Sequence, residues 1–117
     1  MIDLHAAAAV DLTHEPVAAG QVVEGAPTTG YAALGEFGGQ EYGVWEMSVG
    51  AMSDVEEDEL FIVISGSGEL LLEGGETRPL EIGVVGRLEA GQRTVWTVTS
   101  TLRKVYVSGA SISGAGA

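Results

Sequence analysis

Glycine is the feature of this sequence that most limits its possible folds. The chain has 18 glycines among 117 residues, and they recur between short runs rich in valine, isoleucine, leucine and threonine. Such runs favour extended strands, and the glycines between them favour tight turns. No stretch has the apolar stripe of a long amphipathic helix. The sequence therefore predicts an all-β fold, either a sandwich or a barrel.

A chain of 117 residues is expected to form one domain. We expect an N-terminal arm over residues 1–19, a barrel over 20–108 and a disordered tail over 109–117, where all the residues are small or polar except one isoleucine. Eight or nine short strands are expected in the barrel. A double-sheet jelly roll accommodates such a set of strands.

Three turns define how these strands are expected to connect. Residues 66–68, Gly-Ser-Gly, predict a turn after an almost continuous apolar strand, and the glycine pair at 74–75 predicts a hairpin. Residues 94–99 and 102–108 are expected to form the last hairpin.

Composition excludes several classes of function. The net charge is −12, and all five basic residues lie in the second half of the chain, which argues against binding to nucleic acid or to an anionic membrane. There is no cysteine, so disulfides, thiolate metal sites and a cysteine nucleophile are excluded. The N-terminus lacks the basic residues of a secretory signal, and we expect a cytoplasmic protein.

Two linked spacings give a more specific signal. Glu59 is followed seven residues later by Gly66, and Gly83 is followed by Gly91 and then, three residues on, by Thr94. With the flanking segments 43–46, 57–59 and 103–107, this pattern resembles the cupins, in particular the small single-domain cupins that include the cupin domains of ureidoglycine aminohydrolase and of ethanolamine-utilisation proteins. The resemblance implies a double-stranded β-helix, the jelly-roll cupin barrel.

The same resemblance locates the positions at which cupins usually carry metal-binding histidines. Here these positions hold Thr94 and either Ser53 and Val55 or Met52 and Asp54, depending on the alignment. Imidazole nitrogens suit transition metals, whereas one or two carboxylates and a hydroxyl suit them poorly. A hard cation held mostly by water remains an alternative. We predict no metal site and no cofactor.

The resemblance directs the side chain of Glu59 into the barrel. There it could remain from an ancestral site, or it could exchange a proton with a ligand as the candidate catalytic residue. Lys104 and Tyr106 share one face of the last strand because they are two residues apart. If Lys104 faces inward, its charge needs a partner, and Glu59 or Glu46 could provide it. If it faces outward, it is one of few cations on an acidic surface.

Aromatic residues give the second part of the candidate site. Trp96 shares a face with Thr94, so both are expected to point inward. Trp45 lies on an earlier strand. The two tryptophans could be core residues, or they could form the wall of a ligand pocket. The ligand-binding residues that we predict are Trp45, Asp54, Glu59, Thr94, Trp96, Lys104 and Tyr106.

Three functions are compatible with these residues. The first is a binding module for a small polar metabolite, without a tightly bound transition metal. The second is an enzyme acting on small metabolites, aminohydrolase-like or isomerase-like, that uses Glu59 with or without a weakly held divalent cation. The third is a structural dimerisation module. A homodimer is the expected assembly in any of these, because the barrel has sheet edges and an aromatic-bearing face available for burial.

Overall fold

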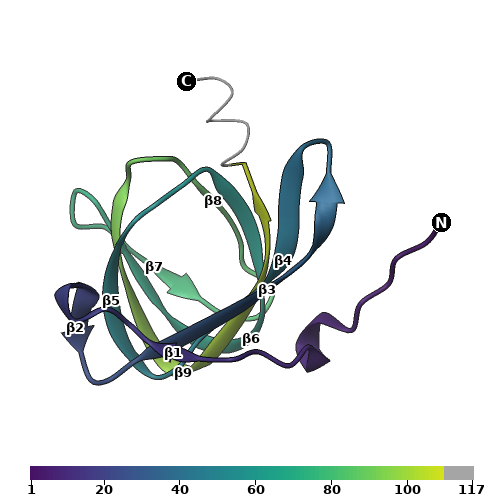
Figure 1. Cartoon of the computed structure of the whole chain (residues 1–117). Coiled ribbons are helices and arrows are strands. Elements are labelled where there is room, and N and C mark those ends of the chain that lie inside the picture. The colour runs from purple at the N-terminus through teal and green to yellow at the C-terminus, as the bar shows by residue number, and fades with distance from the viewer. Residues whose placement is uncertain (110–117) are drawn as a thin grey trace.

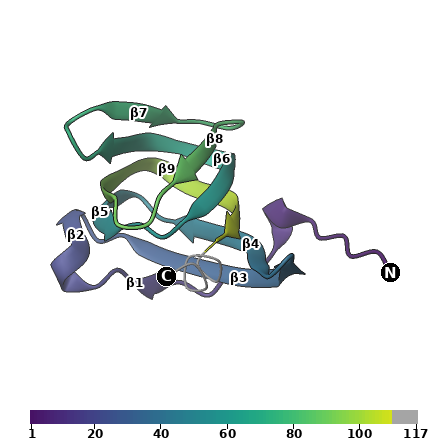
Figure 2. The same cartoon turned by 90° about the horizontal axis from the view of Figure 1, so that it is seen from above.

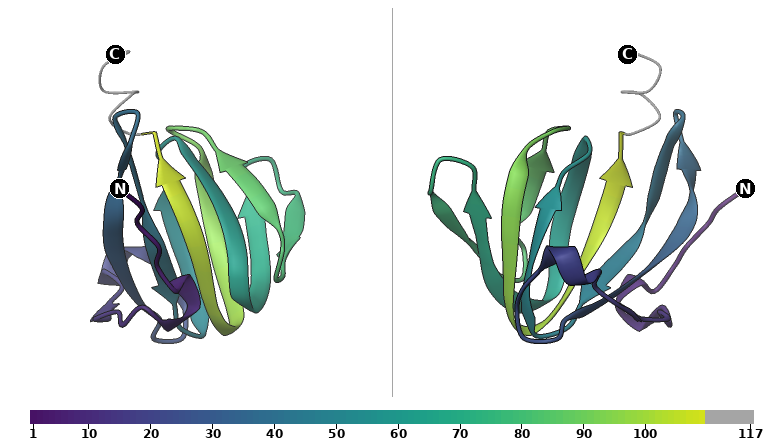
Figure 3. Two further views of the ribbon diagram at one scale, coloured as in Figure 1. Left: turned by 90° about the vertical axis from the view of Figure 1, so that its right-hand side faces the viewer. Right: turned by 60° about the vertical axis from the view of Figure 1, so that its left-hand side comes forward.

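Two long strands, β6 (Glu59–Leu72) and β9 (Arg93–Ser108), form the centre of the structure. The computed structural model describes residues 1–109. In it β6 and β9 pair antiparallel along nearly their whole length, from Glu59 opposite Ser108 to Leu72 opposite Thr94. Because both strands are bent, each contributes to two layers of a sheet that curls into a cup (Figure 3).

The first layer contains the C-terminal half of β9 and the N-terminal half of β6. Its strands, in spatial order around these two, are β1 (Glu15–Pro16), β3 (Thr28–Phe37), β4 (Gln40–Met47), β9, β6 and β8 (Val85–Leu88). The β3–β4 hairpin projects beyond the rest of this layer, as the end-on view shows (Figure 1).

The second layer contains the remaining halves of the two long strands. Its strands, in spatial order, are β2 (Val22–Glu24), β5 (Gly50–Val55), β9, β6 and β7 (Thr77–Leu80). All pairs are antiparallel, and two short 3-10 turns, Ala7–Ala9 and Ala19–Gln21, are the only helical segments among residues 1–109. The fold is therefore the predicted all-β jelly-roll barrel (Figure 2).

The expected turn at residues 66–68 is wrong, because β6 continues through it. Gly66 has a φ of +84°, and a Cβ atom there would collide with the carbonyl oxygen of Thr101 on β9. The glycine therefore permits a bend and a close approach between two paired strands, which the sequence made look like a chain reversal. The glycine pair at 74–75 does form the predicted hairpin turn between β6 and β7.

The expected last hairpin, 94–99 with 102–108, is also wrong, since these residues form the single strand β9. Its exposed middle segment, Thr99, Ser100 and Thr101, lies at the bend between the two layers. Three exposed polar residues between apolar runs have the composition of a turn, although here they continue one strand, in which Ser100 pairs with Ser67.

Inward side chains of both layers form one core. The most deeply buried large residues include Met47, Val63, Trp96 and Leu102, each at most 1% exposed. Burying a side chain of this size stabilises the fold by about 1.5–3 kcal/mol. The strand β1 lies within the segment expected as an arm and pairs with β3.

The tail expected at 109–117 lies outside the described residues from position 110 onward. Within residues 1–109, no helix has the length and the apolar character that crossing a bilayer would require.

Candidate functional site

A cavity of about 280 Å³ lies inside the barrel between β3, β4, β5, β6 and β9. Six of the seven residues predicted as ligand-binding line it: Trp45, Asp54, Glu59, Trp96, Lys104 and Tyr106. Thr94, the seventh, is buried and does not line this cavity. The remaining lining residues are Tyr31, Glu41, Glu56, Glu57 and Ser108.

Lys104 carries the only cationic side chain on the wall of this cavity. The residue is 4% exposed, and its Nζ donates a hydrogen bond to Glu59 Oε2 over 2.6 Å. Of the alternatives left open by the sequence, Lys104 therefore faces inward and Glu59 is its partner. Because a buried ammonium is costly without a counter-charge, this pair fixes the positions of both groups.

Three aromatic rings surround the ammonium of Lys104. Its Nζ lies 4.5 Å from the ring centroid of Trp45, 4.9 Å from that of Phe61 and 4.4 Å from that of Trp96. All three distances fall within the range of cation–π attraction. The register explains this arrangement, since Trp45 lies opposite Lys104 across β4 and β9.

The rings also contact each other. The centroids of Trp45 and Trp96 lie 5.4 Å apart with the ring planes at 53°, and those of Phe61 and Trp96 lie 5.7 Å apart at 55°. Tilted contacts at these distances are favourable for aromatic pairs. The two tryptophans therefore pack against the core and also form one wall of the cavity.

A buried carboxylate that the sequence interpretation did not select holds Trp96 in place. Glu56 is 6% exposed, and its Oε2 accepts hydrogen bonds from Thr94 Oγ1 at 2.6 Å and Trp96 Nε1 at 2.9 Å. Thr94 therefore contributes to the site indirectly, through its hydrogen bond to the carboxylate that also binds Trp96. Glu56 belongs to an acidic run, residues 56–59, and nothing in that run distinguishes it from its neighbours.

Asp54 is a lining carboxylate with a raised pKa. Burial, and to a smaller extent the neighbouring charge of Glu56, together raise the pKa of Asp54 to about 6. Its Oδ1 accepts a hydrogen bond from the backbone N–H of Val55 at 2.9 Å. A carboxyl group with this pKa is mostly ionised at neutral pH and still exchanges protons readily there.

Tyr106 and Glu41 also line the cavity. The phenol of Tyr106 donates a hydrogen bond to Glu41 Oε2 over 2.7 Å, and burial together with this bond raises the pKa of Tyr106 above its ordinary value. Gly43 leaves the space for this phenol, because a Cβ atom at Gly43 would lie 2.7 Å from the Tyr106 oxygen. Tyr31 is 66% exposed and borders the cavity, so this side communicates with solvent.

The residues at the positions of the cupin histidines do not fit a transition metal. The hydroxyl of Thr94 is bonded to Glu56, and the carboxylate of Glu59 is bonded to Lys104. Within residues 1–109, no group of three or more histidine, cysteine, aspartate or glutamate side chains is arranged to hold a metal ion. The chemistry of the cavity therefore comes from carboxylates, one ammonium and aromatic rings.

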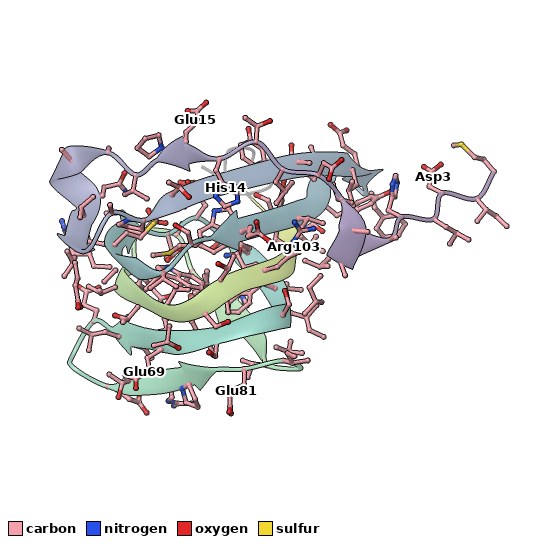
Figure 4. All side chains as sticks on the ribbon, turned by 90° about the horizontal axis from the view of Figure 1, so that it is seen from below. Asp3, His14, Glu15, Glu69, Glu81 and Arg103 are labelled. Carbon is pink, nitrogen blue, oxygen red and sulfur yellow. The ribbon has the colours of Figure 1, made fainter. Side chains whose placement is uncertain are left out.

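A second polar network lies on the outer face of the barrel and was missed at the sequence level. Glu46 Oε1 lies 2.7 Å from His14 Nε2, and Glu46 Oε2 accepts a hydrogen bond from Arg103 Nε at 2.9 Å. Figure 4 labels His14 and Arg103 among the side chains. Burial alone would raise the pKa of Glu46, but the hydrogen bonds from Arg103 and His14 outweigh it and lower that pKa.

Arg103 also ties the N-terminal arm to the barrel. Its Nη1 donates hydrogen bonds of 2.8 Å to the carbonyl oxygens of Ala7 and Val10. His14 and Glu46 are 32 residues apart in the chain, and their approach depends on the pairing of β1 with β3. No sequence spacing signals such a contact.

Comparison with known proteins supports the interpretation of the fold. The model of the EutQ-like cupin domain matches residues 34–106. Comparison with curated proteins finds no match.

Solved structures include several similar barrels. A protein of unknown function from Pseudomonas syringae pv. tomato is 25% identical with a TM-score of 0.73 over 85% of this chain and 44% of that one, so this chain spans less than half of that protein. The EutQ protein of Clostridium difficile is 19% identical with a TM-score of 0.62, over 70% of this chain and 68% of that one. A putative ethanolamine utilization protein from Salmonella typhimurium is 15% identical with a TM-score of 0.59, over 84% and 94%. At these identities the last two likenesses concern the fold alone.

Proposed function

The chain belongs to the family of EutQ-like cupin domains, and from this premise we propose that it binds a small polar metabolite inside its barrel. The main support is the convergence of six predicted residues, from four different strands, on one cavity. Concave sites with aromatic walls and a few polar groups are the usual form of small-molecule sites.

The size of the cavity limits the ligand. A volume of about 280 Å³ corresponds to about nine non-hydrogen atoms, at the ~30 Å³ that a water molecule occupies in the liquid. This size suits an amino acid, a small amine or a ureide. The proposal includes no tightly bound transition metal, because Lys104 already neutralises Glu59 at the position that the resemblance assigns to a metal ligand.

Tryptophan emission tests this proposal directly. Trp45 and Trp96 are the only tryptophans in the chain, and both line the cavity. In a panel of small amino acids, amines, carboxylic acids and ureides, we expect at least one compound to change the tryptophan emission saturably. The same compound should raise the Tm over the same range of ligand concentration. A panel in which no compound changes either signal would contradict the proposal.

A proton-transfer enzyme is the second candidate, and Asp54 is the observation that favours it. The sequence pointed to Glu59 as the catalytic residue, but Glu59 is bonded to Lys104, whereas Asp54 has a pKa of about 6 and borders the same cavity. A carboxyl group near neutral pKa is an effective general base. Turnover of a compound that binds, lost in Asp54→Asn even when the compound saturates the variant, would distinguish the enzyme from the binding module.

A homodimer remains part of the proposal. Leu60, Ile62 and Val85 are exposed on neighbouring strands, and Ile62 lies opposite Val85 in the register. Exposed apolar side chains that adjoin one another suit an interface between two copies. Light scattering coupled to size exclusion should give twice the mass of the chain, and a single-chain mass would contradict the dimer.

A further inference from the structure

We propose that the ligand of the barrel cavity carries a protonated nitrogen, such as a primary ammonium or an amidinium, and that this group binds against Asp54. The inference rests on the proposed binding function and adds the chemical class of the ligand. It follows from the charges on the cavity wall, from the way in which those charges are paired, and from the rings that accompany them.

The wall of the cavity carries a large excess of negative charge. Its acidic members are Glu41, Asp54, Glu56, Glu57 and Glu59, and its cationic member is Lys104. A ligand with a positive charge reduces the repulsion among these carboxylates, which is strong because the site is partly shielded from water. A ligand with a negative charge increases the repulsion.

The pairing of these carboxylates points to Asp54. Glu59 is paired with Lys104, Glu56 accepts hydrogen bonds from Thr94 and Trp96, and Glu41 accepts one from Tyr106.

Asp54 differs from these three carboxylates. Its one hydrogen bond in the described part of the chain is from a backbone N–H, to Oδ1. Among the partly or fully buried acids of the cavity, Asp54 is thus the one that no side-chain donor serves, and a ligand N–H group can take that role.

The aromatic rings give an independent observation that favours a nitrogen cation. The cavity wall already holds one alkylammonium, the side chain of Lys104, within 5 Å of the three rings of Trp45, Phe61 and Trp96. Tyr31 and Tyr106 add two further rings beside the remaining space. Rings of this kind attract cations through their faces and do not attract carboxylates.

An anionic ligand has no comparable partner here. It would have to bind to Lys104, whose ammonium is already bonded to Glu59 at 2.6 Å. That ammonium has two further N–H donors, but an anion accepting from them would lie beside Asp54, Glu56 and Glu59, whose negative charges repel it. The arrangement therefore selects against carboxylates and phosphates.

Three compounds of one shape and different charge test the inference: propylammonium, propanol and propionate. They are titrated at constant ionic strength into ¹⁵N-labelled protein, with the indole N–H signals of Trp45 and Trp96 as the readout. We expect propylammonium to bind at least about tenfold more tightly than propanol, since a charge-assisted hydrogen bond contributes about 1.5–3 kcal/mol. Propionate is expected to bind most weakly.

Two variants locate the binding group. Asp54→Asn keeps the shape of the side chain and should weaken propylammonium binding about tenfold. Glu69→Gln removes one charge from an exposed position on β6 outside the cavity and should leave the affinity within about twofold, because an exposed charge at a distance is screened.

The outcomes separate this inference from the proposed function. If propionate or propanol binds as tightly as propylammonium, or if Asp54→Asn binds propylammonium as well as the wild type, the inference is wrong while the cavity remains a binding site. If none of the three compounds nor any member of the metabolite panel moves the indole signals, both the inference and the proposed function are wrong.

Discussion

Lys104 shows how one residue organises the interior of this barrel. An ammonium with 4% of its residue surface exposed would be strongly destabilising alone, and two kinds of contact offset that cost. The carboxylate of Glu59 supplies the counter-charge, and the three rings supply cation–π attraction. Removing either charge leaves the other buried without a partner.

We predict that Lys104→Met lowers the free energy of unfolding by about 3 kcal/mol, because it leaves Glu59 unpaired. The double variant Lys104→Met/Glu59→Gln should be more stable than this single variant by about 1 kcal/mol or more, since it removes the orphaned charge as well. Urea denaturation of the wild type, the two single variants and the double variant measures both differences.

Arg87→Gln serves as the control for these variants. It removes the same charge from an exposed side chain and should change the stability by less than about 0.5 kcal/mol. Additive effects of Lys104→Met and Glu59→Gln would show that the two groups do not form the pair described above.

Asp54 gives a pH-dependent prediction. Its pKa is raised from 3.8 to about 6, so the folded protein binds a proton there that the unfolded chain has released between these two pH values. The contribution of Asp54 to the free energy of unfolding therefore falls as the pH rises from 4 to 6, and this loss of stability persists above pH 6. The Asp54→Asn variant has no carboxyl group at this position, so it does not lose stability in this way.

We therefore predict that Asp54→Asn is more stable than the wild type by about 1–2 kcal/mol at pH 7.5, after allowing for partial solvent exposure. The difference should vanish below pH 4. Urea denaturation across this pH range measures it, with Glu69→Gln as a control whose effect should stay small throughout. A variant that is less stable than the wild type at pH 7.5 would contradict the assigned environment of Asp54.

The residue-level predictions depended on strand periodicity, and their limits follow from it. Alternation placed Trp96 with Thr94 and Lys104 with Tyr106, because neighbouring residues of a strand point to opposite faces. Alternation cannot identify a contact between strands far apart in the chain. The partner of Lys104 stayed open for this reason, and the role of Glu56 was missed.

At the scale of elements, the bent strands β6 and β9 explain both the cup shape and the two wrong turns. A glycine or a polar triplet that permits a bend has the same composition as one that reverses the chain. What differs is the neighbouring strand, since Gly66 lies against Thr101 whereas Gly74 has open space around it. This difference depends on the tertiary structure, and no short stretch of the sequence reveals it.

These two glycines give a matched pair of variants. Gly66 has a φ of +84° and Gly74 a φ of +102°, so alanine at either position costs about 1–2 kcal/mol for the left-handed backbone. Gly66→Ala should cost about 2 kcal/mol more than Gly74→Ala, because its methyl group would also collide with β9. Equal losses in thermal or urea denaturation would contradict the bend at Gly66.

At the scale of the whole molecule, part of the negative charge of the chain lies around the cavity. The chain carries a net charge of −12, and five of its carboxylates line the interior space. The barrel fold was predictable from the glycine spacing and the linked motif residues, and the matched family model agrees with it. The N-terminal contacts of Arg103 were not predictable, because they join residues more than 90 positions apart.

A whole-molecule consequence is that chelation should not affect the fold. A structural metal present at a free concentration a hundred times its Kd would stabilise the protein by about 2.7 kcal/mol. Removing that metal would lower the Tm by several degrees. We predict that dialysis against EDTA leaves the Tm unchanged. A drop that is restored by manganese, iron or zinc would contradict the donor set described above.

The NMR signal of the Lys104 ammonium tests the organisation of the cavity most directly. Lys104 is the only lysine in the chain, so a ¹⁵Nζ-detected spectrum contains one lysine signal. We predict a slowly exchanging signal, shifted by the rings of Trp45, Phe61 and Trp96, that moves when propylammonium is added and loses its protection in Glu59→Gln. A rapidly exchanging signal at the position of free lysine, unchanged by the ligand, would contradict both the caged ion pair and the site built around it.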